Sequence, residues 1–531
     1  MIRRWLRRRR SSAALRHLVL PRDGFRAAVA REPSRLALVA PRGSLTYGEL
    51  GSRVRRLAAA LDARGVGRGS AVFAQLRDDW EQVELRLAAQ EIGALFAGFS
   101  PADATDLVAR AAAAARPRVF VYDPSFAAGT ARRFAEAGEP YGLIAVGGEY
   151  ERWLQRAADH QPGADVAPED PAVLALTAGT GGAPAMVCLD QADLLHGARV
   201  FAGMAGFEPD PVLLSGVPLG APGAGTLLAA VLCGGTLVLA DSRAADGLLP
   251  LVARHGVTRM LVTSSQLVDV LDSDELDAAD LASLRGVVYG SAPMPAAKLE
   301  DALLLFGPML TQVYALAECA APIASLPAAM HVSGSRPAPR CVLTSAGQVP
   351  RGAGVRVHGA DGHDLPAGTP GELLVRLPDC FPGYWHDPDL ARERVIDGYL
   401  RTGDLGTLDG RGGFQVLGRC DEVIERPGCR IVPRLVEEMV HDHPAVKEAA
   451  LAQPRRGGEV VLCVSLRRAL RDRRDRIERS LEAFCRERIA TPEQPDRIEI
   501  VDELPRSAAG KVSRRELAEA LAAVSAAPIP T

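Results

Sequence analysis

Residues 176–187 read LTAGTGGAPAMV, and the rest of the chain is organised around this stretch. An apolar run typical of a strand, Val173–Leu176, leads into it. Glycines allow several backbone amides to point into one concavity, so a loop of this composition can hold an anion. The loop is not a Walker A loop, because the spacing G-x-x-x-x-G-K-[ST] is absent. Taken alone, the stretch also fits an ordinary connection between a strand and a loop.

Length and composition indicate a globular chain with more than one domain. Its 531 residues exceed one ordinary domain, and 47% apolar with 24% charged residues provides ample material for cores. A net charge of -3 gives no reason to expect nucleic acid or an acidic surface as partner. The nine cysteines stand singly between Cys188 and Cys485 without a C-x-x-C pair, which predicts reduced thiols in the cytoplasm rather than disulfides or a zinc site.

Two segments have features that could indicate binding to a membrane or crossing of it. Met1–Arg10 is strongly basic but has no apolar run behind it, so we expect a solvated tail rather than a secretion signal, with contact to a membrane surface or partner left open. Between Asp210 and Asp241 there is no charge, but prolines and glycines interrupt the segment. It splits into strand, helix and strand, which predicts buried α/β core and no transmembrane segment.

Strand and helix patterns alternate from Leu36 to Pro101. A helix carries Val54, Leu57 and Leu61 on one face, Ser70–Leu76 reads as a strand, and Gln82–Ile92 is again helical. This alternation predicts an open α/β sheet. Ligands of such sheets bind at the carboxyl ends of strands.

Polar groups follow two later strands. Val287–Tyr289 runs into the turn Gly290-Ser291-Ala292-Pro293, and Tyr314 lies four residues before Glu318. An aromatic ring can cover a nucleobase, and a carboxylate can hold Mg²⁺ against phosphate oxygens. A buried tyrosine and a surface glutamate explain the second pair equally well.

In this order the motifs resemble those of the adenylate-forming superfamily of acyl-CoA synthetases, peptide-synthetase adenylation domains and luciferases. The loop at 177–186 is similar to the family's T-S-G-T-T-G-x-P-K-G. Residues 399–404 (YLRTGD), 418–424 (GRCDEVI) and 504–514 (LPRSAAGKVSR) resemble three later family motifs. The resemblance covers the chain from about Leu36 to Leu521.

The resemblance implies an α/β fold. A large N-terminal domain of the adenylate-forming type would have stacked mixed sheets with helices, and a small mobile C-terminal α/β domain would follow. The expected boundaries are 1–20 for the basic tail, 21–418 for the large AMP-binding domain and 419–531 for the small domain, with a hinge near Asp421.

The resemblance also implies two half-reactions. A carboxylate attacks the α-phosphate of ATP, which gives an acyl-adenylate and pyrophosphate, and a thiol of coenzyme A or of a carrier phosphopantetheine then takes the acyl group. It assigns catalysis to Lys511, Mg²⁺ binding to Glu318 and the thiol-acceptor loop to Gly428. The residues expected to bind ATP or AMP are Thr177, Gly179, Thr180, Gly182, Gly290, Ser291, Ala292, Pro293, Tyr314, Asp404 and Arg419.

The lysines make the last motif informative, because Lys298, Lys447 and Lys511 are the only ones in an arginine-rich chain. A lysine kept at position 511 suggests that a compact ammonium is needed there. The phosphate loop departs from the family, since Ala185 stands where lysine is usual. Each lost donor to a charged group costs about 1.5–3 kcal/mol, so a silent homologue that binds nucleotide or acyl groups stays an alternative.

The acid and the acceptor are expected from weaker signals. The position at which amino-acid-activating relatives place an aspartate is Ala221, and its neighbours, including Gly223, are small and uncharged. An uncharged pocket fits a fatty or aryl acid better than an amino acid. Coenzyme A is the expected acceptor, and a separate carrier protein acting in trans is the alternative.

Overall fold

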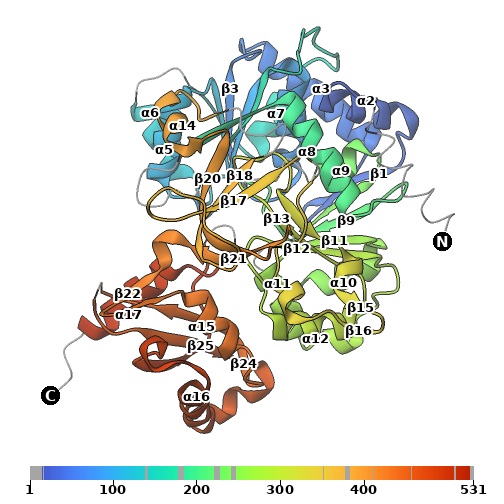
Figure 1. Ribbon diagram of the computed structural model, residues 1–531. Helices are drawn as coiled ribbons and strands as arrows, with labels where there is room; N and C mark the ends of the chain where they lie inside the picture. Colours follow the sequence, from blue (N-terminus) through green and yellow to red (C-terminus); the bar gives the residue numbers. More distant parts are fainter. Residues whose placement is uncertain are drawn as a thin grey trace.

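The computed structural model describes residues 15–531 except 16, 138–140, 178–184, 221–227, 241–246, 351, 377–382, 411, 456, 508–509 and 527–531. Figure 1 shows a large N-terminal domain and, at the lower left in orange and red, a small C-terminal domain. This confirms the fold class expected from the sequence.

The first sheet of the large domain has the strand order β14-β13-β12-β11-β9-β10-β1-β2. The inner strands are mutually parallel, and the edge strands β2 and β14 are antiparallel to their neighbours. The carboxyl ends of β11, β12 and β13 therefore lie at one edge. The strands are β1 (Leu36–Ala40), β2 (Gly43–Thr46), β9 (Val212–Ser215), β10 (Thr236–Leu239), β11 (Arg259–Thr263), β12 (Gly286–Gly290), β13 (Leu310–Tyr314) and β14 (Ala324–Leu326).

The second sheet has the order β6-β5-β3-β4-β7-β8, and only β8 is antiparallel to its neighbour among these strands. The loop at 177–185 therefore joins the two strands of the β7–β8 hairpin. The strands are β3 (Ala71–Gln75), β4 (Leu95–Phe99), β5 (Val119–Tyr122), β6 (Gly142–Ala145), β7 (Pro171–Leu176) and β8 (Met186–Asp190).

One hydrophobic core joins these two sheets. It contains Leu38 and Leu237 from the first sheet, Val72 and Val119 from the second, and Leu57 from α3. Helices α3 and α4 thus pack between the layers, and α4 is buried from its second residue to its last. The helices of the large domain are α2 (Pro21–Arg31), α3 (Tyr47–Asp62), α4 (Trp80–Ile92), α5 (Thr105–Ala115), α6 (Ala128–Glu136), α7 (Gly148–Arg156), α8 (Gln191–Met204), α9 (Leu228–Leu232), α10 (Leu248–His255), α11 (Ser264–Leu271), α12 (Ala296–Phe306), α13 (Arg340–Leu343) and α14 (Pro388–Arg394).

A third, smaller sheet and the small domain complete the chain. The third sheet has the order β17-β18-β20-β19, with β21 also pairing β20, and the small domain has the sheet β24-β25-β26 and the hairpin β22–β23. The elements are β17 (Gly354–His358), β18 (Gly371–Arg376), β19 (Val395–Ile396), β20 (Tyr399–Leu408), β21 (Phe414–Arg419), β22 (Ile424–Arg426), β23 (Cys429–Ile431), α15 (Pro433–Val440), β24 (Val446–Ala452), β25 (Val461–Leu466), α16 (Arg474–Arg488), β26 (Arg497–Val501) and α17 (Arg514–Ala526).

The expected N-terminal tail and the uncharged segment can be followed in part. Within the tail, Leu15 is fully buried, and the Arg199 guanidinium donates to the carbonyls of Leu15 and Leu18. The uncharged segment gives β9, α9 and β10, as predicted. Among the described residues, no helix is both long enough and apolar enough to cross a membrane.

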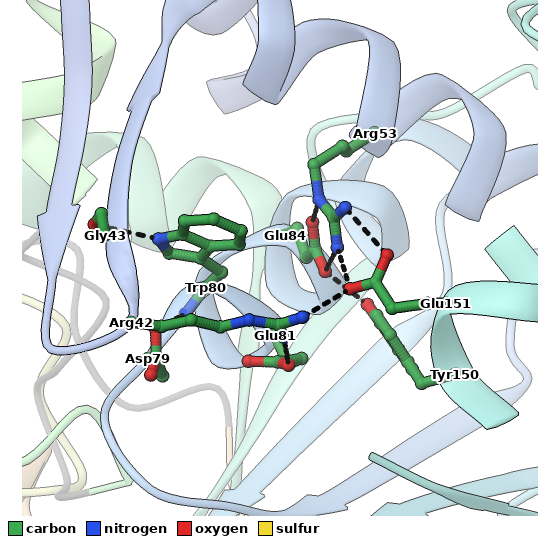
Figure 2. Close-up of polar contacts among 9 residues, drawn as sticks. All are labelled: Arg42, Gly43, Arg53, Asp79, Trp80, Glu81, Glu84, Tyr150 and Glu151. Atoms are coloured by element: carbon green, nitrogen blue, oxygen red, sulfur yellow. Dashed lines mark hydrogen bonds and ion pairs between the residues drawn. The ribbon is translucent and has the colours of Figure 1, made fainter. Parts of the chain in front are cut away.

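A buried charge network ties α4 to its neighbours (Figure 2). Arg53 on α3 donates from Nε to Glu84 Oε2 at 2.7 Å and from Nη2 to Glu151 Oε1 at 3.0 Å. Glu84 is fully buried and also accepts from Tyr150 Oη at 2.7 Å. Arg42, whose guanidinium also lies over the Trp80 ring, pairs with Glu81 and with Glu151. Two carboxylates of α4, Glu81 and Glu84, thus pair with arginines of neighbouring elements.

A buried histidine makes stability depend on pH. Pro327 O can only accept, so His331 Nδ1 donates to it at 3.1 Å, and Nε2 lies 2.9 Å from Tyr289 Oη, which also lies 3.1 Å from Gln312 Oε1. This neutral ring is fully buried, and burial lowers the pKa of His331 to about 4.

Because the folded-state pKa lies below the unfolded value of about 6.5, the unfolded chain binds more protons between these values. The contribution of neutral His331 to the free energy of unfolding is therefore fully present above about pH 6.5. As the pH falls towards 4, about 3 kcal/mol of this contribution is lost. We expect His331→Gln to flatten the fall of the unfolding free energy between pH 6.5 and 4. Wild-type and variant curves that stay parallel through this window would contradict the assignment.

Candidate nucleotide site

Asp404 is the best-connected group of the candidate site. It lies on β20, is 7% exposed, and accepts from Tyr314 Oη at 2.6 Å and from Arg419 Nη1 at 3.0 Å. Burial and the Asp404 charge raise the pKa of Tyr314 well above its usual range, so its hydroxyl stays protonated and donates. The three residues that the motifs predicted separately therefore form one hydrogen-bonded group.

Local structure explains this geometry. Asp404 and Arg419 lie opposite each other in the β20–β21 ladder. Gly403 has φ +70°, and a Cβ there would approach Arg419 Nη2 to 2.6 Å, so glycine lets the guanidinium reach the carboxylate. Burial acts to lower the pKa of Arg419, but Asp404 raises it above its ordinary value. Arg419 therefore stays charged.

The turn after β12 lies at the same edge of the first sheet as Tyr314. Ser264 Oγ donates to Ala292 O at 2.6 Å and to Gly290 O at 3.2 Å, which fixes the turn against the start of α11. Ser291 has φ +74° and is exposed, and Pro293 follows in the same turn. The turn thus lies at the strand ends next to Tyr314, because Gly290 pairs with Val313, and its contact with adenine stays a prediction.

Lys511 comes to this place from the other domain. Its neighbour Gly510 lies against Thr263 at the end of β11, with 3.7 Å between a Cβ built on Gly510 and Thr263 Cγ2. The Lys511 side chain remains exposed, yet the protein around it is dense enough that burial lowers its pKa, while the nearby Asp404 charge raises it. The loop of the small domain therefore brings Lys511 close enough for its charge to interact with that of Asp404.

Glu318 is linked to the phosphate-loop hairpin. Tyr384 Oη donates to Glu318 Oε1 at 3.1 Å, and the Tyr384 backbone pairs with Val187 on β8. At the base of the loop, Thr177 N donates to Ala185 O at 2.9 Å. Tyr384 therefore joins Glu318 to the hairpin, a role that these contacts between distant residues reveal.

Mg²⁺ usually keeps several waters and is bound through one or two carboxylates plus substrate phosphates. Glu318 fits that requirement, and no group of three or more metal-ligating side chains occurs among the described residues. The Glu318 carboxylate therefore suits the single protein contact of a magnesium ion that is also bound by phosphates.

The remaining expected site residues belong to other segments than the Asp404 group or fall outside the residues that the structure describes. Asp421 follows Arg419, with 3.6 Å between Arg419 Nε and Asp421 Oδ1, and Gly428 has φ +75° in the β22–β23 hairpin turn, with open space beside it. Gly179, Thr180 and Gly182 of the phosphate loop, and Ala221 and Gly223 of the acid pocket, lie outside the described residues.

Two charged side chains, one on α4 and one just before this helix, fix the segment that leads to the expected acid pocket. Leu219 N donates to Asp78 Oδ1 at 2.9 Å, and Arg86 Nη2 donates to Leu219 O at 3.1 Å. Arg86 is buried over the Phe96 ring, and burial lowers its pKa to about 10. Sequence reasoning missed both groups, because a charged helical residue is ordinarily expected to face solvent.

Two protein-family descriptions match the chain, AMP-binding enzyme over residues 25–385 and AMP-binding enzyme C-terminal domain over residues 435–511. The chain belongs to the AMP-binding enzyme family. The indoleacetate–CoA ligase of Aromatoleum aromaticum is 31% identical over 92% of this chain and 96% of its own length. The fatty acid–[acyl-carrier-protein] ligase ScoC of Streptomyces coeruleorubidus is 27% identical over 92% of this chain and 93% of its own.

A solved structure agrees with these relatives. The amide bond synthetase McbA from Marinactinospora thermotolerans matches with a TM-score of 0.79 and 29% identity, covering 94% of this chain and 99% of its own. This AMP-binding enzyme is therefore an ATP-binding, AMP-forming ligase of the acyl-CoA synthetase family.

The Tyr314 hydroxyl can be tested in this AMP-binding enzyme. Tyr314→Phe removes the donor to Asp404 and leaves the ring, which packs edge-on against Phe414 with centroids 5.7 Å apart. Loss of a hydrogen bond to a charged group costs about 1.5–3 kcal/mol, so we expect the Kd for ATP to rise at least tenfold. Equilibrium ATP binding measures the effect, and an unchanged melting temperature shows that the variant is folded. An unchanged Kd would remove Tyr314 from the nucleotide site.

Proposed function

We propose that this ligase activates a fatty or aryl carboxylic acid as its acyl-adenylate and transfers the acyl group to the thiol of coenzyme A. The observation that carries the proposal is that the small-domain loop of Lys511 lies against the end of β11, close enough for the Asp404 charge to act on the Lys511 ammonium, while Asp404 binds Tyr314 and the boundary residue Arg419. A site completed by two domains suits a reaction that joins two substrates. The names of the two curated relatives, an aryl-acid and a fatty-acid ligase, support the class of acid.

In the first half-reaction a carboxylate oxygen attacks the α-phosphorus of ATP, and the bond to the β-phosphate oxygen breaks. Asp404 would accept from the two ribose hydroxyls, with Arg419 and Tyr314 holding its carboxylate in place. The Gly290–Pro293 turn would lie along the adenine. The Lys511 ammonium would neutralise charge shared by the entering carboxylate and the α-phosphate, which is the main way proteins assist phosphoryl transfer.

The pyrophosphate would leave along the loop of Thr177, Gly179, Thr180 and Gly182, held by backbone amides. Glu318 would hold Mg²⁺, which neutralises phosphate charge when bound. Because Ala185 supplies no cation, a larger share of the charge neutralisation would fall to Lys511 and the metal.

In the second half-reaction the thiol sulfur bonds to the acyl carbon, and AMP leaves with the electron pair of the acyl–oxygen bond. We propose that the small domain, 419–531, rotates about Asp421 between the steps. This rotation would withdraw Lys511 and bring the Gly428 turn towards the thiol. The acid would lie beside Ala221 and Gly223.

The test is ATP–pyrophosphate exchange with separate pools of fatty, aryl and amino acids, with and without a chelator of divalent cations. Exchange with a fatty or aryl pool that the chelator stops is the expected result. Exchange with amino acids alone would contradict the proposed acid class. No exchange by protein that still binds ATP would favour the silent homologue.

The acceptor is tested next with the acid identified in that assay. Coenzyme A, a pantetheinylated carrier protein and a simple amine are compared, because the relatives include a carrier-protein ligase and an amide bond synthetase. Fastest AMP release with coenzyme A is expected. Faster release with the carrier protein or the amine would mean that this group, and not coenzyme A, is the acceptor.

A further inference from the structure

A single carboxylate of the large domain binds two cations of the small domain. Asp269 lies on α11, and its Oδ1 is 2.7 Å from Lys447 Nζ, while its Oδ2 is 3.5 Å from Arg506 Nη2. The three side chains are only 22%, 11% and 28% exposed, in the same order. An ion pair this sheltered is screened less than one on the open surface, and losing one partner leaves the others uncompensated.

Arg506 connects this carboxylate to the Lys511 loop. Its backbone pairs with Val512 across the loop, and its Nη2 also binds Glu448 Oε2 at 2.7 Å. Within the loop, Ser507 N donates to Lys511 O at 2.8 Å. The loop that carries Lys511 is therefore closed by the residue that binds Asp269.

The far end of the loop is fixed within the small domain. Arg514, the first residue of α17, donates from Nη2 to Glu437 Oε2 at 2.8 Å, and Glu437 is 4% exposed. With Arg514 at one end and Arg506 at the other, the loop has little freedom to move alone. The contacts that hold the small domain therefore determine where the Lys511 loop lies relative to the nucleotide site.

Two neighbouring contacts hold the same part of the small domain. Lys298 on α12, which is 3% exposed, donates from Nζ to Val446 O at 2.5 Å. Asp272 lies 3.7 Å from Lys447 Nζ and accepts from Arg468 N at 3.2 Å. These contacts position the start of β24, but only Asp269 also reaches the Lys511 loop through Arg506.

We propose that Asp269 is a positioning residue that holds Lys511 at the nucleotide site during adenylation, acting through Arg506 and Lys447. The role rests on the proposed function, in which Lys511 serves the first half-reaction. In this role Asp269 acts on Lys511 through protein contacts and not on the substrates themselves. Its removal should therefore slow adenylation and leave acyl transfer from a preformed acyl-adenylate unchanged.

The test compares Asp269→Asn, Asp269→Glu and wild type in both half-reactions. Asp269→Asn keeps the shape and removes the charge, so we expect kcat for pyrophosphate exchange to fall about tenfold with an unchanged KM for ATP. Asp269→Glu should restore most of this loss. Asp274→Asn is the matched control, because Asp274 pairs with Arg468 at 3.5 Å but is 85% exposed, and such pairs contribute little.

Amide hydrogen exchange of the Lys511 loop provides a readout that needs no turnover. In Asp269→Asn we expect faster exchange at 507–512 than in wild type, with the Asp274→Asn control unchanged. Equal exchange in Asp269→Asn and wild type would overturn the proposal, as would a parallel loss of both half-reactions. If wild type activates no acid, the proposed function fails, and the amide measurement alone still decides whether Asp269 holds the loop.

Discussion

Replacing Lys511 with alanine is expected to lower the rate of ATP–pyrophosphate exchange by about 10²–10³-fold. Removing one group that stabilises transition-state charge has effects of this size in other enzymes. Here the effect should be near the upper end, because the phosphate loop has Ala185 in place of a cation. No other lysine can substitute, since Lys298 and Lys447 are both engaged in contacts between the domains.

The measurement is exchange at saturating ATP with the acid identified from the pools. Binding of ATP should weaken far less than the rate falls, because Tyr314, Asp404 and the turn after β12 remain. Lys511→Arg is the informative companion, since it keeps the charge but replaces a compact ammonium with a wide planar group. Exchange by Lys511→Ala at the wild-type rate would show that adenylation proceeds without the loop.

The second large effect is expected in stability. Arg53→Leu removes the guanidinium that neutralises Glu84 and leaves this fully buried carboxylate with the Tyr150 hydroxyl as its remaining hydrogen-bond donor in Figure 2. Breaking a buried pair by removing one partner costs about 3–5 kcal/mol. We therefore expect a markedly lower midpoint in thermal and urea unfolding of the large domain.

Arg55→Leu provides a matched control on the same helix. Arg55 Nε lies 2.7 Å from Asp159 Oδ1, but the two side chains are 33% and 30% exposed. A pair this open to water contributes about 0–1 kcal/mol. Equal destabilisation by the two variants would mean that the network around Glu84 contributes no more to stability than an exposed ion pair.

Much of the fold could be predicted from local patterns. The strand expected at 70–76 is β3 (Ala71–Gln75), and the helix expected at 82–92 is α4, ended by Gly93 at φ +68°. These elements depend on apolar periodicity and on a glycine where the chain turns, and neighbouring residues determine both. The arrangement of stacked sheets followed from the family resemblance rather than from periodicity.

The sequence predicted which residues belong to the candidate site, but it did not predict how they are arranged. Tyr314 and Asp404 are 90 residues apart in sequence, and nothing local indicates that one donates to the other. The buried charges of α4 were equally hidden, because Glu84 is neutralised by an arginine on a different helix. Contacts between distant elements depend on how layers pack, and a single sequence carries no pattern for them.

The distribution of the three lysines has a practical consequence. In this structure Lys298 is 3% exposed and the Lys447 side chain 11%, whereas Lys511 is exposed. An amine-reactive label should therefore modify Lys511 first, and the other two side chains only when the domains separate. With three lysines and one α-amino group, the number of labels on each molecule, read by intact-mass spectrometry, shows directly whether Lys298 and Lys447 become accessible.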